Sequence, residues 1–111
     1  MPARHSLGEF EQLVLLAILQ LRDNAYAPHI SRVLEKKAGR GVSRGALYAT
    51  LDRLQRKRFV EWKIQAATSR RRGNRRRLFT VTPRGVEAAA VSREALLKLW
   101  KGLGGMLTRP G

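Results

Sequence analysis

The apolar positions along the chain recur with the periods of three helices, two strands and a final helix. Between Leu7 and Leu21 they fall three and four residues apart, which is the spacing of an amphipathic helix. Further leucines widen this stripe, so we expect the helix to be covered by more than one neighbour, including a second subunit. Asp23-Asn24 interrupts the pattern, and a second helix is expected from about Pro28 to Gly39.

A third helix is expected to begin after Ser43, whose side chain suits the N-cap position. Its apolar line runs from Ala46 to Leu54, and its other face carries several arginines and a tyrosine. The link between the second and third helices is short. That is typical of a helix-turn-helix, in which the second helix of the pair reads DNA.

Apolar and polar residues then alternate from Val60 to Ala66, and this period of two predicts a half-buried strand. A return strand is expected over 77–82, with Gly73-Asn74 at the hairpin tip. Thr82-Pro83 suits an N-cap followed by a first-turn proline, and opens a last helix that is expected to reach Leu103 before a glycine-rich tail.

The whole pattern predicts a mainly α fold with a small β-hairpin, which is a winged helix-turn-helix with a C-terminal dimerisation helix. We expect the DNA-binding domain to cover residues 1–83. The dimerisation helix and a loose tail are expected to cover residues 84–111.

The charge of the chain is concentrated in one block. The sequence has 23 Lys and Arg against 8 Asp and Glu, a net charge of +15, with 43% hydrophobic residues. Residues 36–77 hold fifteen of the basic residues and two of the acids. A folded protein with this regional excess calls for a polyanionic partner, so the block is the expected binding face.

The sequence gives little sign of a metal site, a catalytic site or a membrane segment. Cysteine is absent and only two histidines occur, without the spacing of metal ligands, so we expect no metal, cofactor or catalytic site. No phosphate-binding loop or nucleophile elbow appears. No apolar stretch approaches the ~20 residues that span a bilayer, and we expect a cytoplasmic protein without a membrane partner.

Four strings resemble the PadR family of bacterial transcriptional regulators. They lie at 13–19 (LVLLAIL), 26–30 (YAPHI), 42–54 (VSRGALYATLDRL) and 75–85 (RRRLFTVTPRG). Two positions depart from the family pattern, with Ala27 in place of a glycine and Leu78 in place of an aromatic residue. The resemblance implies a homodimer that binds an inverted-repeat operator, usually as a repressor. It also implies a single C-terminal helix and, in some relatives, release by small aromatic or lipophilic ligands.

The expected DNA contacts lie on the third helix and the hairpin. Arg44 is expected to pair with guanine or grip a phosphate, unless it lies on a solvated face. Tyr48 is expected to reach a phosphate, with a half-buried packing role as the alternative. A glycine at position 45 indicates close approach of the backbone to DNA or to a neighbouring helix. The hairpin arginines would enter a minor groove or bind phosphates, unless the loop is unstructured. The full set is Ser43, Arg44, Gly45, Tyr48, Arg53, Arg70, Arg71, Arg72, Arg75 and Arg76.

The expected dimer contacts come from the first and last helices, because their apolar stripes exceed what one small core can cover. They are Leu13, Leu16, Leu96, Trp100 and Leu103. For Trp100 a ligand-binding role is the alternative.

Three functions remain in competition. The preferred one is a dimeric, sequence-specific regulator that binds double-stranded DNA. The second is an architectural DNA binder or a binder of structured RNA, since +15 suits any polyanion. The third is an interaction module for an acidic protein. RNA binding favours exposed aromatic residues, and this chain has few.

Overall fold

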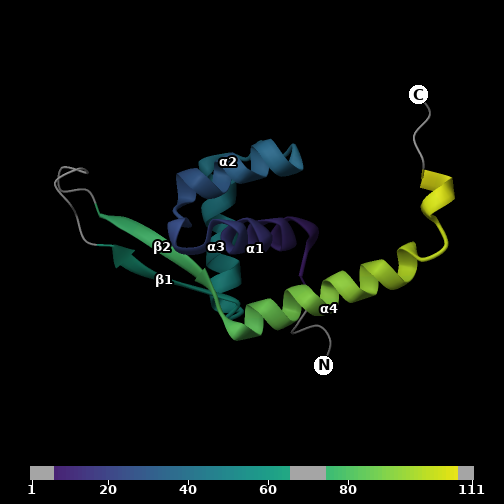
Figure 1. Ribbon diagram of the computed structural model, residues 1–111. Helices are drawn as coiled ribbons and strands as arrows, with labels where there is room; N and C mark the ends of the chain where they lie inside the picture. The colour runs from purple at the N-terminus through teal and green to yellow at the C-terminus, as the bar shows by residue number, and fades with distance from the viewer. Residues whose placement is uncertain (1–6, 66–74, 108–111) are drawn as a thin grey trace.

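The computed structural model describes residues 7–65 and 75–107 as three packed helices, an antiparallel hairpin and a long final helix (Figure 1). The hairpin and the final helix extend from opposite sides of the three-helix bundle. The elements are α1 (Glu9–Leu21), η2 (Arg22–Asn24), α2 (Ala27–Ala38), α3 (Arg44–Arg56), β1 (Val60–Gln65), β2 (Arg76–Val81), α4 (Pro83–Trp100) and η4 (Gly104–Leu107). This arrangement confirms the predicted winged helix-turn-helix.

The helix boundaries follow from local capping. The Ser43 hydroxyl accepts a hydrogen bond from the Ala46 N–H at 3.1 Å, and the Thr82 hydroxyl accepts one from the Gly85 N–H at 3.0 Å. Gly39 ends α2 in the left-handed conformation, with φ 64°. All three boundaries were expected from the sequence.

The end of α4 differs from the sequence-based expectation. The helix stops at Trp100 rather than Leu103, and Gly102 follows with φ 84°, a conformation that ends helical hydrogen bonding. The segment after it is not wholly loose, since Gly104–Leu107 forms a short 3-10 helix. Leu103 therefore lies outside the helix that the apolar pattern assigned to it.

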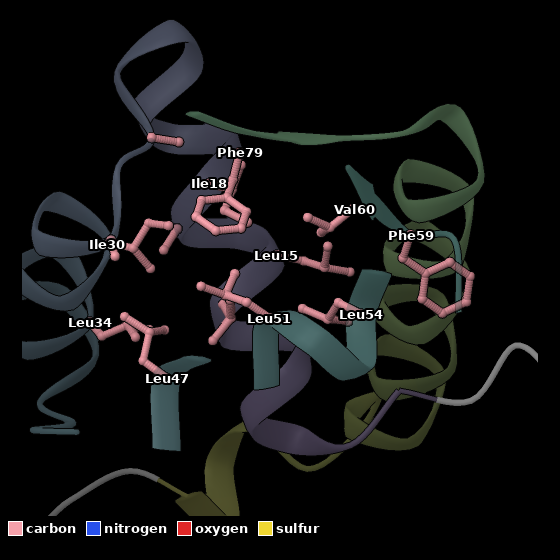
Figure 2. Close-up of a cluster of buried hydrophobic side chains, with 14 of the residues drawn as sticks. Leu15, Ile18, Ile30, Leu34, Leu47, Leu51, Leu54, Phe59, Val60 and Phe79 are labelled. Carbon is pink, nitrogen blue, oxygen red and sulfur yellow. The ribbon is translucent and has the colours of Figure 1, made fainter. Parts of the chain in front are cut away.

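The core surrounds α1. Figure 2 shows labelled side chains from α1, α2, α3 and both strands gathered around this helix, and the same cluster includes Ala88 of α4. The largest fully buried ones are Leu15, Ile18, Ile30, Leu34, Leu51, Leu54, Phe59 and Phe79, with Val14 and Val60. The spacing of the apolar positions on each helix places them on one face, and hydrophobic burial then fixes the three helices against each other.

The hairpin is anchored at its base. Val60 pairs with Val81 and Gln65 with Arg76 in an antiparallel register. The Phe79 N–H donates to the Ala25 carbonyl at 3.0 Å, which joins β2 to the segment before α2. The expected tip at Gly73-Asn74 lies outside the described residues.

The C-terminal half of α4 has little to pack on within the chain. Gly85 and Ala88 are buried at its start, whereas every residue from Arg93 to Trp100 is exposed. Leu99 is 75% exposed, although it lies on the same side of the helix as Ala88. Among the described residues, no helix is both long enough and apolar enough to cross a membrane.

Candidate nucleic-acid interface

The outward side of α3 is small and polar. Leu47, Leu51 and Leu54 are buried against the core, and this orientation leaves the opposite side of the helix open. Gly45, Ala49, Asp52 and Arg56 are all exposed, at spacings of three and four residues, so they form one stripe along the helix. A helix that presents such a stripe can approach a flat or grooved partner closely at its N-terminal end, where the side chains are smallest.

Arg44 and Tyr48 lie one turn apart at the start of α3. The Arg44 guanidinium carbon is 5.8 Å from the centre of the Tyr48 ring, and Arg44 is exposed. The Tyr48 ring is half-buried and packs against the core, in agreement with the packing alternative. The two side chains line a groove of about 280 Å³ between the N-terminal ends of α2 and α3. Contact of the Tyr48 hydroxyl with a phosphate stays a prediction.

The space around Gly45 bears on why a glycine stands at this position. A Cβ built at this position meets no atom within 4 Å. No helix of the described chain therefore requires a glycine here. Close approach of the Gly45 backbone to DNA stays a prediction.

Arg53, on the far half of α3, is turned toward α1. Its Nε lies 3.4 Å from Oε2 of Glu11, and its terminal nitrogen donates to the Thr50 hydroxyl at 3.1 Å. Lys57, just after α3, donates to both carboxylate oxygens of Glu11 at 2.8 and 3.0 Å. DNA contact by Arg53 stays a prediction, but in this structure its guanidinium is engaged within the chain.

Glu11 is a charged residue that the sequence analysis did not single out. The residue is 6% exposed, and its carboxylate also accepts a hydrogen bond from the Gly8 N–H at 2.9 Å. Burial alone would raise the pKa of Glu11, but the hydrogen bonds from Lys57 and Gly8, the charge of Lys57 and the bond from Arg53 outweigh it and lower the pKa below its usual value. The one available signal was an acid on the buried side of an apolar helix, three residues after its N-cap.

Arg76 and Arg77 of β2 lie against aromatic rings. The guanidinium of Arg76 lies 3.9 Å from the centre of the Tyr26 ring, and that of Arg77 lies 4.4 Å from Trp62. Trp62 in turn donates its Nε1–H to Gln55 of α3 at 3.0 Å, which fixes the hairpin relative to this helix. Arg75 is exposed. Arg70, Arg71 and Arg72 lie outside the described residues.

A second site, away from the basic face, is an apolar groove of about 450 Å³ between α1 and α4. It brings together three of the expected dimer residues, Leu16, Leu96 and Trp100. Leu13 instead lies on the α2 side of α1, and Leu103 lies past the end of α4. The groove is lined by Gln12, Leu16, Ala89, Ala90, Arg93, Leu96, Leu97 and Trp100.

A model of the PadR-like family of transcriptional regulators matches residues 15–91. The chain belongs to this family. The match runs from the middle of α1 to the middle of α4, and so includes the whole helix-turn-helix and hairpin. A comparison with curated proteins finds no match.

Solved structures of PadR-like regulators have the same fold. One from Bacillus cereus is 23% identical, with a TM-score of 0.71 over 91% of this chain and 93% of its own. A PadR family regulator from Clostridium difficile is 17% identical, with a TM-score of 0.70 over 89% of this chain and 99% of its own. One from Eggerthella lenta is 22% identical, with a TM-score of 0.67 over 92% and 88%.

The PadR-like fold accounts for the arrangement of the basic residues. It places the hairpin next to α3, to which Trp62 and Gln55 join it, and extends α4 from the opposite side of the bundle (Figure 1). Among the described residues, no three His, Cys, Asp or Glu side chains gather as metal ligands would. The chain is a member of a family of transcriptional regulators, and its apolar groove between α1 and α4 shares no lining residue with the groove beside Arg44 and Tyr48.

Proposed function

We propose that this PadR-like protein is a homodimeric repressor that binds an inverted-repeat operator in the cytoplasm. The observation that carries the proposal is the outward stripe of α3 beside a hairpin that Trp62 and Gln55 fix in place. A helix of this kind in the major groove meets a distinct pattern of donors and acceptors at each base pair.

Arg44 is the proposed base reader. It is exposed at the first position of α3, where a recognition helix presents its residues to base edges. Ser43 and Gly45 allow the helix end to approach the DNA, and Tyr48 and the arginines of the hairpin supply phosphate contacts. In this arrangement the hairpin gives affinity and α3 gives sequence preference.

The proposed dimer covers the exposed apolar side of α4. Leu96, Leu97 and Trp100 are each about half exposed and border the groove against α1. A second copy related by a two-fold axis would fill this groove and place two α3 helices about 34 Å apart, one turn of DNA. The same apolar lining would accept a small aromatic or lipophilic effector.

The sequence preference is tested with Arg44→Ala. Affinity is measured for a duplex selected from a random pool and for a scrambled duplex of equal length. The difference in binding free energy between the two duplexes should shrink by about 1–3 kcal/mol if Arg44 pairs with a guanine. Arg32→Ala on α2 removes the same charge and should leave this difference unchanged. An equal loss on both duplexes would make Arg44 a phosphate contact, and equal affinities of the wild type would favour an architectural or RNA-binding role.

The hairpin is tested by the salt dependence of binding. Neutralising Z phosphates gives a slope of about −0.9Z in log K against log salt. Replacing Arg71, Arg72 and Arg75 with alanine should therefore flatten the slope. An unchanged slope would mean that the hairpin does not touch DNA.

The dimer is tested by sedimentation of the Leu96→Glu, Trp100→Glu double variant. Truncating an aromatic anchor commonly costs 2 kcal/mol or more, roughly thirtyfold in dissociation constant, and two buried charges should cost more. We expect a monomer at micromolar concentration. Lys98→Glu places a glutamate on the opposite face of the same helix and should stay dimeric. A monomeric wild type, or a dimeric double variant, would remove this interface.

A further inference from the structure

Two glutamates in the first turn of α1 contact basic side chains of the helix-turn-helix. Glu11 accepts hydrogen bonds from Lys57 at 2.8 and 3.0 Å and lies 3.4 Å from Nε of Arg53. Two residues earlier, Glu9 lies 3.4 Å from the guanidinium of Arg40, which also lies 5.5 Å from the centre of the Phe10 ring. The acidic turn is therefore in contact with both ends of the α3 region, through the linker before it and the last turns of the helix.

Arg53 is held at two points. Besides its contact with Glu11, it donates to the Thr50 hydroxyl, which itself donates to the Ala46 carbonyl at 3.0 Å. The side chain nevertheless keeps 49% of its exposure. Its guanidinium thus follows the surface of α3 toward α1, and reaching a DNA backbone on the outward side would require it to leave both partners.

A carboxylate offers a guanidinium the same kind of partner as a phosphate, namely a negatively charged group with adjacent acceptor oxygens. The Glu11 carboxylate is buried and is fixed from behind by the Gly8 N–H and by Lys57, so it cannot follow Arg53 outward. The competition between this carboxylate and a phosphate is therefore decided by the position of α1 against α3.

We propose that Glu11 is a positioning residue that holds Arg53 against α1 and withholds it from DNA phosphates. The proposal rests on the DNA binding proposed above. It reverses the sequence-based expectation that Arg53 is itself a DNA contact. Its consequence is that part of the charge of α3 does not contribute to sequence-independent affinity, which leaves a larger share of the binding to base contacts.

The test is the salt dependence of binding to a mixed-sequence duplex of about two helical turns, for wild type, Arg53→Gln, Glu11→Gln and the double variant. Each phosphate contact contributes about 0.9 to the slope. We expect Arg53→Gln to keep the wild-type slope and Glu11→Gln to steepen it by at least about 0.9 per protomer. The double variant should lose the share of Arg53, about 0.9, from that increase, and any remainder belongs to Lys57, which Glu11 also holds.

Glu35→Gln is the matched control. It removes the same charge from an exposed position on α2 and should leave the slope unchanged, which separates local release of Arg53 from a change in net charge. Glu11→Asp keeps a carboxylate and should restore the wild-type slope. If the role of Glu11 were purely structural, Glu11→Gln would lower the stability of the protein without steepening the salt dependence of binding.

Two results would overturn the inference. A flatter slope for Arg53→Gln in the wild-type background would show that Arg53 already binds phosphate, and this variant stays informative even if Glu11→Gln fails to fold. A folded Glu11→Gln protein with the wild-type slope would show that nothing was withheld. A wild type that binds no duplex at low salt would instead overturn DNA binding itself, and with it the inference.

Discussion

Gly85→Ala should destabilise the protein, because this residue lies where α4 meets the start of β1 without room for a side chain. A Cβ built on Gly85 would lie 2.2 Å from the Phe59 carbonyl oxygen and 2.7 Å from a Val81 methyl carbon. The oxygen belongs to the backbone and accepts the Thr82 N–H at 3.0 Å. Relief of the clash therefore requires α4 to move away from the hydrogen bond that anchors it.

The size of the effect follows from three contributions. Overpacking a tight site costs about 1–3 kcal/mol, and the distance to the oxygen, more than 1 Å short of ordinary contact, places this site at the upper end. Weakening the Thr82 hydrogen bond would add about 1 kcal/mol at most. Alanine regains about 1 kcal/mol through its better helix propensity. We expect the free energy of unfolding to fall by about 2–3 kcal/mol.

Urea denaturation followed by circular dichroism measures this loss, and Gly45→Ala is the matched control. Gly45 also lies in a first helical turn, but a Cβ there meets nothing within 4 Å. Its stability should be unchanged or rise by up to about 1 kcal/mol, while its affinity for duplex DNA should fall. The reasoning is refuted if the two alanine variants unfold at the same urea concentration.

Three further predictions concern stability. The pKa of Glu11 is lowered in the folded protein, so its ionised carboxylate stabilises the fold above the ordinary pKa of 4.5, and this stabilisation is lost as the pH falls through the folded pKa. In urea denaturation over that pH range, the Glu11→Gln variant should therefore lose less stability than the wild type. Leu54→Ala should cost about 2–5 kcal/mol, because this side chain is fully buried among α1, α3 and β1, and a melting temperature near that of wild type would contradict the core assignment. Ser43→Ala should cost about 1 kcal/mol through loss of its bond to the Ala46 N–H, whereas Ser43→Asp should keep most of it.

The helices and strands could be predicted from patterns that involve residues close together in the sequence. The period of the apolar residues places Leu47, Leu51 and Leu54 on one face of α3 whatever the surroundings, because a helix turns every 3.6 residues. Ser43, Gly39 and Thr82 act on backbone groups within four residues, so their capping roles could be identified from the sequence. The end of α4 was less secure, since the apolar line continued past the glycine at which the backbone departs from a helix.

The candidate interface was predicted in part. Arg44 and Gly45 are exposed as expected, because a residue that is off the apolar stripe of a packed helix faces outward. The fate of Arg53, Lys57 and Arg76 could not be predicted in the same way. Each is a long, flexible basic side chain, and its contact partner is the acid or aromatic ring that the tertiary structure places nearby.

The sequence by itself determined the helices, the hairpin, the concentration of charge and the excess of apolar surface at the C-terminal end, since each depends on neighbours a few residues apart. The tertiary structure decided which charges are available. Glu11 meets Arg53 and Lys57 across 42 and 46 residues, and Gly85 meets Phe59 across a whole hairpin. No local period encodes such contacts, because they exist only after hydrophobic burial has set α1 against α3 and α4 against the start of β1.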